Sequence, residues 1–235
     1  MHHDPIITFA DLIPGLNHLP AYVANAILIA LIIVALVLVG TAKLRKGTPE
    51  DHLIPDGKFS LQNLLESIVE VILKLISDTL GAEVARDFLF IIGASVFFIL
   101  FSNLAGLVPG MNPPTDNLNT TAACALTVFG LTHYFGWKEH GAKYLRQFTG
   151  PFLWLSPLMI PIEIIGHLAR PMSLSLRLFG NIMGDHLVAA IFIMLAPLLV
   201  PIPIAFLGLF VAFVQTFVFI LLSMAYFSGA ISHDH

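Results

Sequence analysis

The chain has 235 residues, of which 57% are hydrophobic and only 11% are charged, and its formal net charge is −4. A soluble domain carries about 25% charged residues, so this composition excludes an ordinary globular protein and fits a chain surrounded mostly by lipid. The sequence has no run of basic residues, which argues against a nucleic-acid partner. A single cysteine, Cys124, excludes an internal disulfide.

The first predicted element is a transmembrane helix over residues 21–41. Residues 1–20 before it contain no Lys or Arg and lack the positive region of a secretory signal peptide. The run itself is apolar and interrupted only by Asn25. At about 1.5 Å per residue, a helix of this length crosses a hydrocarbon core of about 30 Å.

Residues 61–80 predict a helix of a different kind. Polar side chains recur at every fourth position and Leu, Ile and Val fill most of the others. The polar positions are Gln62, Glu66, Glu70, Lys74 and Asp78. One polar stripe on an apolar helix is typical of a helix lying along the membrane surface, and Gly81 is predicted to end it.

Residues 88–137 predict the second and third spans, which are separated by a loop that begins at Pro109. The segment 152–228 then holds two long apolar stretches, 152–196 and 203–228, with prolines between them. The predicted fold is therefore all-α and transmembrane, a single membrane domain over 1–235. It has five to six membrane helices, the last two a long, tilted antiparallel hairpin, plus one interfacial amphipathic helix.

The placement of positive charge predicts the orientation of the chain. Nine of the eleven Lys and Arg residues lie in or beside the segments after span one, before span two and after span three. The segments 1–20, 109–117 and 197–203 contain none. The positive-inside rule then places residues 1–20 outside and residues 229–235 in the cytoplasm.

The other two cations lie in the fourth span, within a stripe of polar side chains. Six of these fall within an arc of about 80° on a helix: Glu163, His167, Arg170, Arg177, Asn181 and Asp185. His186 points about 100° away from Asp185. Two cations and two acids would disfavour insertion by about 10 kcal/mol, so such groups are expected to face protein or water and to mark an ion pathway.

Two structural alternatives remain open for the arginines: Arg170 would pair with Glu163 or His167, and Arg177 with Asp185. The helical part of this span, 162–196, would be about 50 Å long, so it must be steeply tilted, or else broken, with Pro171 as a kink site.

The next helix carries one deep polar residue, Gln215. A hairpin turning near residue 196 would place Gln215 opposite Arg177 and Gly208 near Asp185 and His186. Gln215 could equally be a helix–helix hydrogen-bonding residue with no part in transport.

Residues 168–181, Leu-Ala-Arg-Pro-Met-Ser-Leu-Ser-Leu-Arg-Leu-Phe-Gly-Asn, resemble the signature of the a subunit of bacterial F-type ATP synthases. Glu163 and the segments 102–109 and 212–219 match this family as well, and the resemblance covers roughly residues 20–230. It implies a stator subunit, not an enzyme on its own, with a ring of c subunits, the b-subunit peripheral stalk and the rest of the synthase as partners. Arg177 would face the ring carboxylates, and Glu163, Asn181 and Gln215 would belong to a proton path.

The chain departs from the family at the outer end of this path. Bacterial members commonly have Glu where this chain has His186, and His where it has Gly208. We therefore expect Asp185 and His186 together to do the outer work, with His167 beside Glu163 at the inner end. His186 could instead only pack between helices.

The expected function is proton conduction through two half-channels in the bacterial inner membrane, coupled to ATP synthesis on partner subunits. No G-x-x-x-x-G-K-[ST] motif is present, so this chain has no nucleotide site of that kind, and no cofactor or metal is expected. A sodium-translocating version of the same subunit is an alternative. A stand-alone secondary transporter is another, but the inverted repeats typical of that class are not found.

Overall fold

The computed structural model describes residues 18–42, 60–108, 110–145, 156–195 and 201–231. These residues form helices and connecting turns, without a strand among them. The α-helices are α1 (Ala21–Gly40), α2 (Leu61–Leu80), α3 (Ala85–Ala105), α4 (Leu118–His140), α6 (Ser156–Leu195) and α7 (Pro201–Ile231). Two short 3₁₀ helices, η3 (Pro114–Asp116) and η4 (Gly141–Leu145), flank α4. The all-α prediction is confirmed.

Helix α2 has the bounds that its polar stripe predicts. The Ser60 hydroxyl accepts a hydrogen bond from the Asn63 amide at 3.3 Å and caps its start. Gly81 ends it with φ of 96°, a left-handed conformation that favours glycine. Ile72 and Ile76 are buried against the rest of the protein, whereas the charged side chains of the stripe are exposed.

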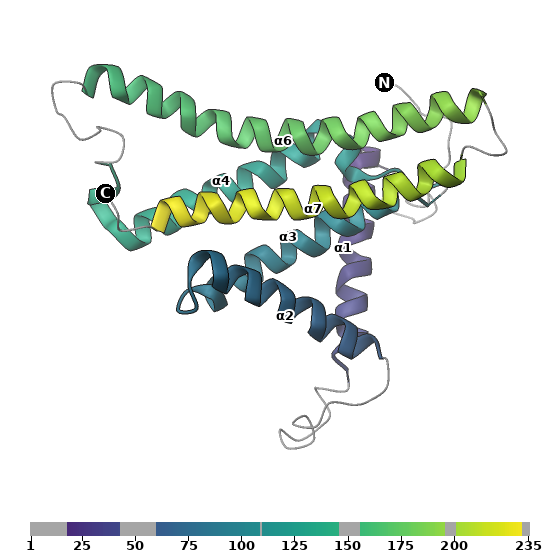
Figure 1. Ribbon diagram of the computed structural model, residues 1–235, viewed down its shortest axis with the longest axis horizontal. Helices are drawn as coiled ribbons and strands as arrows, with labels where there is room; N and C mark the ends of the chain where they lie inside the picture. Colours follow the sequence, from purple (N-terminus) through teal and green to yellow (C-terminus); the bar gives the residue numbers. More distant parts are fainter. Residues whose placement is uncertain (1–17, 43–59, 109, 146–155, 196–200, 232–235) are drawn as a thin grey trace.

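Three of the described helices, α1, α3 and α7, are long and apolar enough to cross a membrane by length and composition. Helices α4 and α6 are long as well, but they carry more polar and charged residues. Figure 1 shows α1 running across the direction of α6 and α7. The protein is thus an all-α membrane protein whose long helices do not all share one direction.

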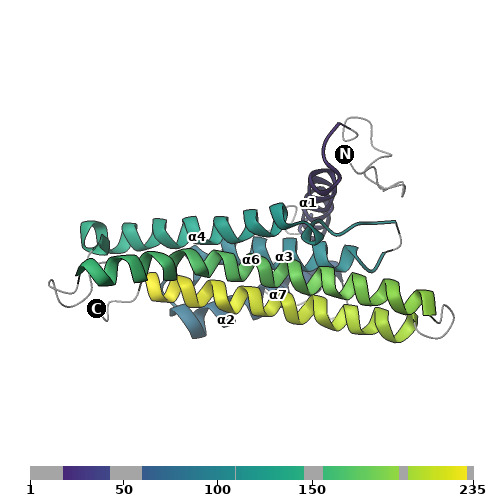
Figure 2. The same ribbon diagram turned by 90° about the horizontal axis from the view of Figure 1, so that it is seen from above.

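Helices α6 and α7 lie side by side as an antiparallel hairpin in both ribbon views (Figures 1 and 2). Helix α6 has 40 residues and continues through Pro161 and Pro171 without a break. Its axis is therefore about 60 Å long, twice the thickness of a hydrocarbon core of about 30 Å. Of the two predicted solutions the structure has the unbroken helix, which fits within a bilayer only if it is steeply tilted.

The core covers only one side of this hairpin. Phe88 of α3 contacts Phe135 of α4 and Phe227 of α7, with ring centroids 4.5 and 5.0 Å apart. Leu174 and Leu178 of α6 reach the same cluster. The other side of α6 and α7 keeps large apolar side chains exposed: Ile165, Met172, Leu176, Phe206, Phe210, Phe213 and Phe217. An uncovered apolar face of this extent marks contact with lipid or with another protein.

Candidate ion-translocation site

Arg177 lies on the uncovered face of α6. Its side chain lines a shallow groove made by other residues of the same helix, among them Leu168, Met172 and Leu176. The guanidinium donates a hydrogen bond to the Ser173 hydroxyl at 3.3 Å. No carboxylate of the described residues lies within ion-pair distance of Arg177 or Arg170. The predicted alternatives, Arg177 with Asp185 and Arg170 with Glu163, are therefore not formed.

Asn181 and Gln215 join α6 to α7. The Asn181 amide donates a hydrogen bond to the Gln215 side-chain oxygen, and Gln215 is buried. Gln215 therefore faces a residue one turn beyond Arg177, whereas the sequence predicts that it lies opposite Arg177 itself. The reason is the turn: α6 ends at Leu195 and α7 begins at Pro201, so the turn is centred on residue 198 and not near 196.

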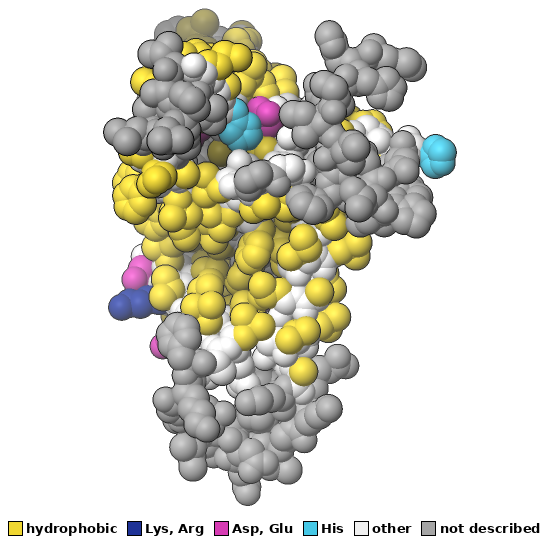
Figure 3. All heavy atoms as spheres, turned by 90° about the vertical axis from the view of Figure 1, so that its right-hand side faces the viewer, with side chains coloured by type: hydrophobic (Ala, Val, Ile, Leu, Met, Phe, Trp, Pro, Cys, Tyr) yellow, Lys and Arg dark blue, Asp and Glu magenta, His cyan; other side chains and the backbone are white. Residues whose placement is uncertain are grey.

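The C-terminal end of the polar stripe also differs from the prediction. A side chain added at Gly208 would first meet Leu107, 3.1 Å away, and neither Asp185 nor His186 lies within 4 Å of that position. His186 instead contacts Asp116 of η3, with 3.5 Å between Nδ1 and Oδ2. Figure 3 faces this end of the molecule and shows a histidine next to an acidic side chain at the surface.

A second polar cluster forms near the start of α6. His167 Nε2 lies 3.2 Å from a Glu163 carboxylate oxygen. The His167 ring lies beside the His133 ring of α4, with centroids 5.2 Å apart. His133 Nδ1 is in turn 2.7 Å from the Tyr144 hydroxyl of η4. Burial raises the pKa of Tyr144, and the nearby positive charge of Arg170 offsets only part of this rise.

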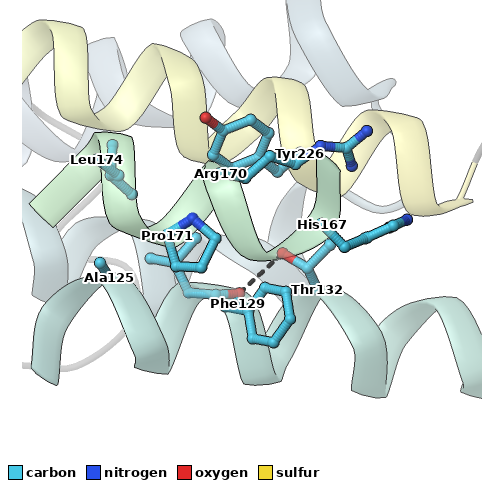
Figure 4. A pocket seen from close by; sticks show the side chains of 9 residues that line it. Ala125, Phe129, Thr132, His167, Arg170, Pro171, Leu174 and Tyr226 are labelled. Carbon is cyan, nitrogen blue, oxygen red and sulfur yellow. Dashed lines mark hydrogen bonds between the residues drawn. The ribbon is translucent and has the colours of Figure 1, made fainter. Parts of the chain in front are cut away.

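Figure 4 shows the small cavity beside this cluster, between α4, α6 and α7. The cavity is small and has room for about one water molecule. His167 and Arg170 line it from α6, and the Arg170 guanidinium lies 5.8 Å from the Tyr226 ring centroid. The Thr132 hydroxyl, which lines the cavity, donates a hydrogen bond to the Val128 carbonyl, drawn as a dashed line.

The polar side chains of the stripe thus divide into a cluster near the start of α6, the central Arg177 and a group in the C-terminal half of the helix. Along α6, Glu163 and Arg177 are about 21 Å apart, and Arg177 and His186 about 14 Å. Four polar residues near the stripe were not singled out from the sequence: Asp116, His133, Tyr144 and Tyr226. They come from other elements, and no local pattern reveals which helix face they meet. The described residues contain no group of three or more His, Cys, Asp and Glu side chains that could hold a metal ion.

A family model described as ATP synthase A chain matches residues 23–228, nearly the whole chain and the whole polar stripe. The chain belongs to this family. The ATP synthase subunit a 1 of Syntrophotalea carbinolica is 51% identical over 203 residues, covering 86% of this chain and 84% of its own. The subunit a of Trichlorobacter lovleyi is 47% identical over 220 residues, covering 94% and 93%. That of Geobacter sulfurreducens is 48% identical over 205 residues, covering 87% and 86%.

Membership in the ATP synthase A chain family makes the protein a membrane-sector subunit of an F-type ATP synthase. It is an ion-translocating component of that complex and not an enzyme on its own. The family and the apolar helices agree on a multi-pass membrane protein.

Proposed function

We propose that this subunit is the proton-conducting stator, with a ring of c subunits against the face of α6 that carries Arg177 and with the b-subunit stalk as a further partner. Two offset half-channels lead to that contact. The outer one uses Asn181, Asp185, His186 and Gln215, and the inner one uses Glu163 and His167. The b-subunit partner rests on the family alone.

The observation that carries the proposal is the setting of Arg177. A guanidinium stays protonated in any protein site, and at membrane depth a charge needs a partner or water. Among the described residues only the Ser173 hydroxyl approaches it, and the side chains around it are mostly apolar and exposed. A carboxylate on another chain, presented by an apolar surface, would satisfy both the charge and the uncovered face.

Ion flow through this contact can drive rotation. A ring carboxylate opposite Arg177 is favoured as the anion, because a close positive charge lowers its pKa. The same carboxylate facing lipid is favoured neutral, since an unpaired buried charge is costly. Passage of the ring past Arg177 therefore requires loss of a proton on one side and gain of a proton on the other.

The two polar groups on α6 lie on opposite sides of Arg177, as offset half-channels require. Because Arg177 is positive, it also repels a proton that would pass directly between them. Each proton that crosses gains about 2.3 kcal/mol per 100 mV of membrane potential. This energy turns the ring, and the partner subunits convert rotation into ATP.

The proposed location is the bacterial inner membrane, with residues 1–20 outside and the cytoplasmic tail at 229–235. The support for this orientation is the bias of Lys and Arg toward the predicted cytoplasmic segments. In this orientation, Asp116 and His186 lie toward the outside, and Tyr144 and Glu163 toward the cytoplasm.

The deciding experiment substitutes Arg177 in the complete synthase. Arg177→Ala should abolish ion-driven ATP synthesis while the complex still assembles. Arg177→Lys should fail as well, because a desolvated lysine can lose its proton. Arg170→Ala is the matched control on the same helix and should keep substantial activity, since Arg170 lies against Tyr226 and away from the uncovered face.

ATP synthesis in membrane vesicles measures each variant, and the yield of purified complex measures assembly. Near-normal synthesis by either Arg177 variant would refute the proposal. Repeating the assay with and without sodium, and with and without a protonophore, separates proton from sodium coupling. Proton coupling predicts complete inhibition by the protonophore and no sodium requirement.

A further inference from the structure

We propose that Asp116 of η3 is the acid that partners His186, and that the two side chains act as one proton-relay dyad at the mouth of the outer half-channel. This inference rests on the proposed function, since it needs protons to move through this end of the subunit. It adds to the path a residue from outside the α6–α7 hairpin.

The contact itself joins two elements that are distant in sequence. His186 Nδ1 lies 3.5 Å from Asp116 Oδ2, and both side chains are more than one-third exposed. They are therefore close enough to share a proton after a small adjustment and open enough to exchange it with water. Among the described residues, Asp185 is a further ionisable neighbour, which precedes His186 in α6 and points in a different direction.

The surroundings hold Asp116 in place. The preceding residue, Thr115, is fully buried, and its hydroxyl donates a hydrogen bond of 2.9 Å to the Asn103 side-chain oxygen of α3. Asp116 is followed by Asn117, which caps the start of α4 by accepting from the Asn119 amide. The buried Thr115 and the capping Asn117 thus fix the backbone on both sides of Asp116.

The surroundings also make room for the imidazole. A Cβ at Gly106, directly after α3, would lie 2.7 Å from His186 Nε2, closer than real Cβ contacts allow. The glycine therefore lets the ring lie against the end of α3 with Nδ1 toward Asp116. Gly106 and the Asn103–Thr115 hydrogen bond are independent features, and both position the same pair.

The dyad has a simple proton chemistry. With a proton on Nδ1 facing the Asp116 carboxylate, the lone pair of Nε2 is free to take a proton from water. The carboxylate stabilises the imidazolium that forms, and Nε2 then releases the proton to the next water on the way to Asn181. One proton enters and one leaves, so neither residue is consumed. Histidine is the side chain most often used to relay protons close to neutrality.

The dyad also explains how the chain works without a histidine on α7. The position that would carry it, Gly208, faces Leu107 and does not contact His186. An acid from η3 therefore replaces a partner from the facing helix.

The test measures ATP-driven proton pumping in inverted vesicles that contain the complete synthase, as a function of pH. Asp116→Asn should lower the pumping rate about tenfold or more, since a positioned proton-transfer group contributes about a hundredfold or more, and should change the pH profile. Asp116→Glu should retain more activity than Asp116→Asn because it keeps the acid. Asp87→Asn, an exposed carboxylate at the start of α3, is the control and should pump normally.

Two further variants test the pairing. Asp116→Asn combined with His186→Asn should be no slower than the worse single variant, because each alone already breaks the dyad. Gly106→Ala should act like Asp116→Asn, since the added methyl group displaces the ring. The yield of assembled complex is measured for each, so that lost assembly is not mistaken for lost relay.

Wild-type pumping and an unchanged pH profile in Asp116→Asn would overturn the dyad, and so would additive effects in the double variant. If Arg177→Ala is inactive in the same vesicles, the proposed function survives that result. If Arg177→Ala pumps normally, the proposed function itself is wrong.

Discussion

Arg170 and Arg177 lie seven residues apart on α6, and their surroundings differ in kind. Arg170 lies over the Tyr226 ring beside a small cavity enclosed by α4, α6 and α7. Arg177 lies on an open apolar face, where the Ser173 hydroxyl is its one hydrogen-bond partner among the described residues. Two identical side chains thus have different surroundings, and of the two Arg177 is the one on the uncovered face.

The hydrogen bond between Asn181 and Gln215 gives a prediction at the level of single side chains. Asn181→Ala and Gln215→Ala should each slow ATP-driven pumping, because each leaves the other amide without its partner. The double variant should be no slower than the worse single variant. Hydrogen bonds between membrane helices average about 0.6 kcal/mol, so the pumping rate is a more sensitive measure than stability.

A matched control for this pair is Thr216→Ala, whose hydroxyl bonds only to its own helix at the Ala212 carbonyl. Strictly additive losses at Asn181 and Gln215 would show that the two amides work separately, and the pair would then have no common role.

At the scale of elements, η4 packs back against α4 at a glycine of α4, Gly136. The buried Tyr144 ring packs directly over Gly136, where an added Cβ would clash with the ring. This contact presents the Tyr144 hydroxyl to His133 at 2.7 Å. The glycine therefore fixes the approach of η4 to the polar cluster that contains His133 and His167.

Gly136→Ala is accordingly expected to destabilise the subunit by about 1–3 kcal/mol, the usual cost of overpacking. Gly130→Ala on the same helix is the control, because a Cβ there meets nothing within 4 Å. Its effect should be neutral or slightly stabilising, since alanine favours helix over glycine. Thermal unfolding of the purified complex, compared with wild type, measures both. Equal melting temperatures for the two variants would contradict the packing argument.

The elements themselves follow closely from sequence, because their causes are local. The four-residue polar stripe and Gly81 give α2 its bounds, and the apolar runs give α1 and α3. The contacts between elements are harder to predict from the sequence. A two-residue difference in the centre of the α6–α7 turn moves Gln215 from Arg177 to Asn181. Contacts such as His186 with Asp116 join separate elements and leave no periodic trace in the sequence.

At the scale of the whole molecule, the stripe on α6 has functional meaning only if its two ends open to opposite sides of the membrane. η3 lies near one end of the stripe through Asp116, and η4 near the other through Tyr144 and His133. The segment that contains η3 has no Lys or Arg, whereas the segment around η4 holds Lys138, Lys143 and Arg146. The positive-inside rule therefore predicts that η3 lies outside and η4 in the cytoplasm.

Cysteine labelling tests this orientation on a Cys124→Ala background, with a thiol reagent that does not cross the membrane. Asn112→Cys is the outer probe, because Asn112 is exposed whereas the nearby Thr115 is fully buried and hydrogen-bonded. Lys143→Cys is the inner probe, exposed in η4. In spheroplasts the reagent should label position 112 and not position 143, and in inverted vesicles it should label position 143 and not position 112. Labelling of position 112 only in inverted vesicles would reverse the topology, and with it the assignment of Asp116 and His186 to the side from which protons enter during ATP synthesis.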